Sequence, residues 1–72
     1  MSITIKSQTL LAINSIAFNS SQNIKMAESP EDLEIFKAYY NTMLICSKAI
    51  SQMSEEDIDT MAESIQQQEL FL

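Results

Sequence analysis

Small and apolar residues recur at steps of three and four along the first third of the chain. The positions that share this spacing are Leu10, Ile13, Ala17, Ser20, Ile24 and Ala27. The pattern predicts an amphipathic helix over residues 7–27. It weakens at residues 19–23, where the side chains favour caps and turns, so a break near Ser20 is an alternative. Residues 1–6 have no partner strand and are expected to form a flexible arm.

A second helix is predicted from about Pro30 to Gln52. Ser29 can cap it with its hydroxyl, Pro30 suits the first helical position, and Glu31 and Asp32 complement the positive end of the helix dipole. One apolar face contains Leu33, Phe36, Tyr40, Met43, Leu44 and Ile50. That face is widened by Tyr39, Cys46, Ala49 and Met53, so more than half of the circumference is apolar.

A third helix is predicted from Glu55 to Gln68, with Ser54 as its cap and acids in its first turn. Its apolar stripe is narrow and contains Ile58, Met61, Ala62 and Ile65. On a neighbouring face, Glu55, Asp59 and Glu63 follow each other at steps of four. Residues 69–72 are expected to form a C-terminal tail.

The links between these helices are very short, and short links make neighbouring helices fold back on each other. The chain contains no glycine and one proline, which disfavours the tight hairpins of β structure. We therefore predict an all-α fold in one domain over residues 1–72. Its architecture is a hairpin of two longer helices with a shorter third helix packed on it.

A chain of 72 residues is marginal for a single core, and small chains often add disulfides, metals or association. One cysteine and no histidine exclude an internal disulfide and a Cys/His metal site. The second helix is also too apolar for two neighbours to cover. We expect a homo-oligomer or a stable partner, with an interface that includes Tyr39, Met43, Cys46 and Met53.

The net charge of −6 is unevenly distributed. Residues 1–27 carry two lysines and no acid, whereas residues 28–72 carry all ten acids and two lysines. Such a chain should repel nucleic acids and anionic membrane surfaces, and it suits a partner protein with a basic surface. No apolar stretch is long enough to span a membrane, and no export signal is visible. These features predict a cytoplasmic protein.

The side chains do not suggest an enzyme. There is no histidine to act as a base near neutral pH, no glycine for a phosphate-binding loop and no arginine to clamp an anion. Cys46 has apolar neighbours and no imidazole to activate it, so we interpret it as an inert thiol. Three carboxylates on one helix do not encircle a cation, so neither a metal nor another cofactor is predicted.

The acids of the third helix instead suggest binding. Like charges at steps of four destabilise a helix slightly, and a basic partner would offset that cost. We therefore predict an adaptor or inhibitor that places Glu55, Asp59 and Glu63 on a partner protein. In size and acidity the chain resembles small phage and plasmid proteins that block host machinery. The alternative is a structural subunit or small chaperone that assembles through its helical hairpin.

The C-terminal residues Gln67-Gln68-Glu69-Leu70-Phe71-Leu72 offer a third reading. They resemble the short peptides by which bacterial proteins dock on the sliding clamp of the replicative polymerase. Gln67, Leu70, Phe71 and Leu72 match that pattern, whereas Gln68 stands where an aliphatic residue is preferred. The resemblance implies a clamp-binding regulator of replication. The other interpretation is that Leu70, Phe71 and Leu72 fold back onto the small core.

Overall fold

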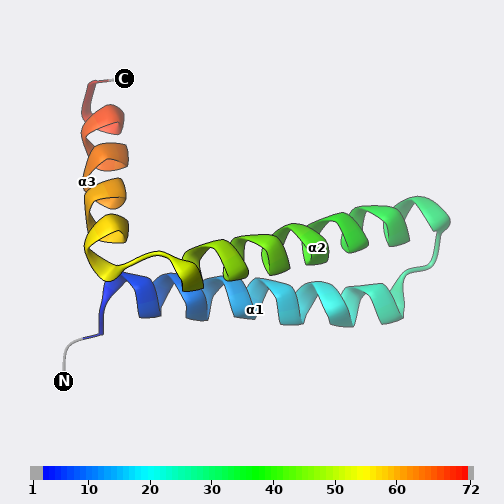
Figure 1. The fold of residues 1–72 in the computed structure, drawn as a ribbon. Coiled ribbons are helices and arrows are strands. Elements are labelled where there is room, and N and C mark those ends of the chain that lie inside the picture. The colour runs from blue at the N-terminus through cyan, green and yellow to red at the C-terminus, as the bar shows by residue number, and fades with distance from the viewer. Residues whose placement is uncertain (1–2, 72) are drawn as a thin grey trace.

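The computed structural model describes residues 3–71, and the side chains of residues 3–69. Within that range it contains three helices and no strand: α1 (Ile5–Met26), α2 (Pro30–Gln52) and α3 (Glu55–Phe71). Figure 1 shows α1 and α2 lying side by side as an antiparallel hairpin, with α3 leaving one end of it. The prediction of an all-α hairpin with a shorter third helix is confirmed.

Each helix begins at a hydroxyl cap. The Ser29 hydroxyl accepts a 3.1 Å hydrogen bond from the Asp32 backbone N–H, and Ser54 accepts one of 3.1 Å from Asp57. Both caps were predicted from the sequence. The third cap is Thr4, which accepts from the Ser7 N–H at 3.1 Å. Because Thr4 caps it, α1 begins at Ile5. The apolar pattern alone had predicted a start at Ser7.

The first helix has no break near Ser20, the position at which the sequence offered a break as an alternative. α1 runs without interruption to Met26, and Ser20 and Ala17 are its buried residues. All six positions of the predicted face are buried or half-buried. Small side chains at Ala17 and Ser20 let the two backbones approach closely. Ser20 is therefore a small residue buried in the hairpin, whereas Asn19 and Asn23 are exposed on the same continuous helix.

Two polar contacts join the helices of the hairpin. The Ser47 hydroxyl of α2 donates to the Asn14 side-chain oxygen of α1 at 3.4 Å. At the other end, the Lys6 ammonium donates to the carbonyl oxygens of Ser51 and Met53, at 3.2 and 2.8 Å. The last carbonyls of a helix lack partners within it, so this lysine satisfies two groups where α2 ends.

α3 packs on the hairpin only near its own start. Ile58 is 4 % exposed there, and α3 contacts the hairpin chiefly through α1. Beyond this joint α3 projects away from the hairpin, so the molecule has the outline of a letter L (Figure 1). The third helix is therefore packed on the hairpin, as predicted, but only at the joint.

The interior is very small. Among the described residues, Ala17 and Ile58 are the buried hydrophobic ones, and no large side chain is fully buried. The radius of gyration is 15.1 Å, whereas a compact chain of this length has about 11 Å. Much of the apolar surface that the sequence provides is thus left on the outside.

Candidate interaction surfaces

The acids predicted to bind a partner lie along α3. Glu55, Asp59 and Glu63 are all exposed, and their spacing of four places them on one side of the helix. In the part of the chain that the structure describes, no group of carboxylates or thiols converges as a metal site would require. These side chains therefore form a linear row of charge along a helix.

Beside this row runs an apolar stripe that is fully covered only at its first residue. Ile58 is buried at the joint and Ala62 is half-buried, but Met61 is 44 % exposed and Ile65 is 50 % exposed. Met61 and Ile65 are one turn apart, so their side chains share a face. The second half of α3 thus presents apolar side chains to solvent next to carboxylates.

The segment that resembles a clamp-binding peptide continues α3 instead of leaving it at Gln68. Gln67 is exposed, and the backbone of Leu70 and Phe71 is helical as far as the last residue of α3. Leu72 lies outside the described residues, as do the side chains of Leu70 and Phe71. The role assigned to these four residues stays a prediction.

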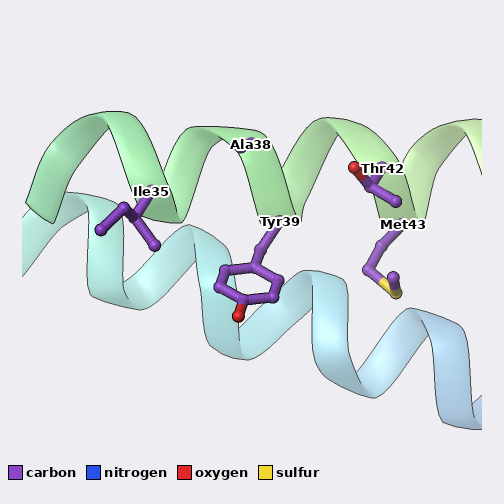
Figure 2. A pocket seen from close by; sticks show the side chains of 5 residues that line it. All are labelled: Ile35, Ala38, Tyr39, Thr42 and Met43. Carbon is purple, nitrogen blue, oxygen red and sulfur yellow. The ribbon is translucent and has the colours of Figure 1, made fainter.

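A second apolar surface lies on α2. Of the residues expected at an oligomer interface, Tyr39 is 57 % exposed, whereas Met43, Cys46 and Met53 are half-buried. Cys46 is a free thiol. An open hollow on this helix is lined by Ile35, Ala38, Tyr39, Thr42 and Met43. Figure 2 shows the side chains of Ile35, Tyr39 and Met43 in a row on one side of the α2 ribbon.

Sequence reasoning missed Ile35, Ala38 and Thr42 as part of this surface. Ile35 is 52 % exposed, and Ala38 and Thr42 are exposed as well. The signal was present, because Ile35, Tyr39 and Met43 follow each other at steps of four. It was obscured by the stripe that begins at Leu33, which covers a neighbouring part of the same helix.

None of the helices described for residues 3–71 combines the length and the apolar character of a membrane span. The acid-flanked stripe of α3 and the apolar hollow of α2 are two exposed surfaces suited to recognition. Comparisons with protein families, with curated proteins and with solved structures find no match to this chain.

Proposed function

We propose that the chain is a protein-binding module, an adaptor or inhibitor, whose third helix docks into a groove on a partner protein. The groove would be apolar at its floor, to receive Met61 and Ile65, and basic along its rim, to face Glu55, Asp59 and Glu63. Helix-in-groove recognition of this kind uses apolar anchors at steps of three and four.

The observation that carries the proposal is the lack of cover on α3 beyond its first turns. Met61 and Ile65 are 44 % and 50 % exposed, although they continue the stripe that begins at the buried Ile58. In proteins most of the stability of a helix comes from tertiary packing of its apolar face, and this 17-residue helix has little such packing. Contact with a partner along this stripe would bury the two side chains and stabilise the helix.

The charge of α3 indicates what kind of partner is favoured. The helix carries six acids and no lysine, while the two lysines of the first 27 residues lie on α1. Carboxylates at the edge of an interface attract a basic surface, speed association and disfavour acidic competitors. The same charge disfavours direct contact with nucleic acid, so a basic protein surface is the better match.

The test is affinity capture with the tagged chain from its native host, with mass spectrometry of the proteins retained. Three baits are compared: the unmodified chain, Ile65→Lys and Ser64→Lys. The two variants change the charge equally at neighbouring exposed positions of α3, but only Ile65 belongs to the apolar stripe.

We expect a specific partner on the unmodified chain and on Ser64→Lys, and its loss on Ile65→Lys. The affinity of that partner should fall as salt concentration rises. Retention of the same partner by all three baits would place the interface elsewhere. A chain that retains no protein, or that turns over a substrate by itself, would overturn the proposal.

A further inference from the structure

The hollow on α2 has a ridge and a groove side by side. Ile35, Tyr39 and Met43 form a row of large side chains at steps of four, which Figure 2 shows leaning to the same side. Ala38, Thr42 and Cys46 form a parallel row of small side chains, also at steps of four. Rows at this spacing are the ridges and grooves by which two helices most commonly pack.

This pair of rows is complementary to itself. When two copies of α2 cross, the ridge of each can enter the groove of the other, as a two-fold symmetric interface requires. Packing of this class gives a crossing angle of about −50°. None of the six side chains is charged, so the centre of a symmetric contact would hold no like charges, although each chain carries a net charge of −6. Glu31 and Glu34 lie one turn before Ile35 and Ala38, at the edge of the contact.

The exposed area is also large enough for a stable dimer. The chain exposes 5884 Å², whereas a compact monomer of 8.1 kDa exposes about 4,500 Å². The difference of about 1,400 Å² is spread over all three helices, and it exceeds the roughly 800 Å² that each partner buries in a protein–protein interface of standard size. Two side chains of the ridge contribute to this excess area, because Ile35 is 52 % exposed and Tyr39 is 57 % exposed.

We propose that two copies of this chain pair through the ridge and groove of α2, with the symmetry axis passing between Tyr39 and Thr42. The four helices of the two hairpins then share one interior, which supplies the core that a single chain lacks. The stripe on α3 is a separate surface, so this proposal does not depend on the docking role of that helix.

The first test is the mass in solution. Light scattering of the unmodified chain should give twice 8.1 kDa, with dissociation on dilution. Ala38→Glu places a charge in the groove without disturbing the hairpin, because Ala38 is exposed. We expect this variant to keep the helical circular dichroism of the unmodified chain and to raise the dissociation constant by about a hundredfold or more.

The second test locates the axis. With Cys46 replaced by serine, Thr42→Cys and Asn41→Cys each offer a single exposed thiol. Under mild oxidation, Thr42→Cys should form disulfide-linked dimers rapidly, because the axis brings its two copies together. Asn41→Cys projects from a different side of α2 and should cross-link only at the slow rate of random collision.

Three results would overturn the proposal. One is a mass of 8.1 kDa up to the solubility limit of the unmodified chain. Another is an unchanged dimer in Ala38→Glu. The third is equal cross-linking of the two cysteine variants. None of these results would change the expectation that Ile65→Lys loses its partner, because that expectation concerns α3.

Discussion

The ammonium nitrogen of Lys6 lies 2.8 Å from the carbonyl oxygen of Met53, which joins the first turn of α1 to the residue that ends α2. The same ammonium reaches the Ser51 carbonyl at 3.2 Å. A cation is favoured at this end of a helix because the unpaired carbonyls concentrate negative charge there. The contact lies two residues before α3 begins, at the joint between the hairpin and the third helix.

Replacing Lys6 should weaken the hairpin measurably. Lys6→Met removes two charge-assisted hydrogen bonds and keeps the length of the side chain, so we expect the free energy of unfolding to fall by about 1–2 kcal/mol. Urea denaturation at one fixed chain concentration measures the change. Lys37→Met, at an exposed position within α2, is the matched control and should change the value by less than about 0.5 kcal/mol. Equal effects of the two substitutions would show that the Lys6 contact does not stabilise the fold.

The local part of this fold was predictable from the sequence. Ser29 and Ser54 are recognisable caps because their neighbours, Pro30 and the following acids, repeat the chemistry that helix starts require. The face from Leu10 to Ala27 was predictable because one helical period governs all of it. In each case the information lies within a few residues of the position concerned.

What the sequence did not reveal depends on contacts between distant residues. Lys6 and Met53 are 47 positions apart, and no periodicity relates them. The direction of α3 could not be predicted either, because a short link does not determine how a helix leaves it. The structure shows that α3 leaves the hairpin at a joint where Ile58 is buried. The hollow on α2 was hidden for a similar reason, since only the position of α1 shows which part of a broad apolar helix remains uncovered.

The attachment of α3 should depend on Ile58. This side chain is 4 % exposed, and truncation of a buried isoleucine to alanine costs about 2–4 kcal/mol. That is a large share of the roughly 3–5 kcal/mol that a core of this size supplies. Ile58→Ala should therefore speed amide hydrogen exchange throughout α3 more than in the hairpin. Ile65→Ala, on the same stripe but 50 % exposed, should change exchange little in the isolated protein. Similar exchange in both variants would mean that α3 is not anchored by this residue.

The close approach of α1 and α2 should make Ala17 intolerant of larger side chains. Ala17 is 8 % exposed, so Ala17→Leu forces the helices apart and should lower the free energy of unfolding by about 1–3 kcal/mol. Ala12→Leu introduces the same side chain at an exposed position of α1 and should be nearly neutral. Chemical denaturation of the two variants measures the difference. If Ala17→Leu were as stable as Ala12→Leu, the hairpin would be packed more loosely at this point than the burial indicates.

The row of acids on α3 should show opposite effects on stability and on binding. Asp59 lies one turn from both Glu55 and Glu63, and like charges at this spacing destabilise a helix slightly. Asp59→Lys converts two repulsive pairs into two attractive ones, so the thermal stability of the free protein should rise, by about 0.5–1 kcal/mol in free energy. The affinity for the captured partner should fall, because a positive charge now faces its basic rim.

Asp59→Asn is the control, because it removes the acid without reversing the charge. Its stability and its affinity for the partner should lie between those of the unmodified chain and those of Asp59→Lys. Calorimetric titration at two salt concentrations would record the binding change. A gain in stability with no loss of affinity would remove Asp59 from the interface and leave docking to the other proposed contact residues of α3.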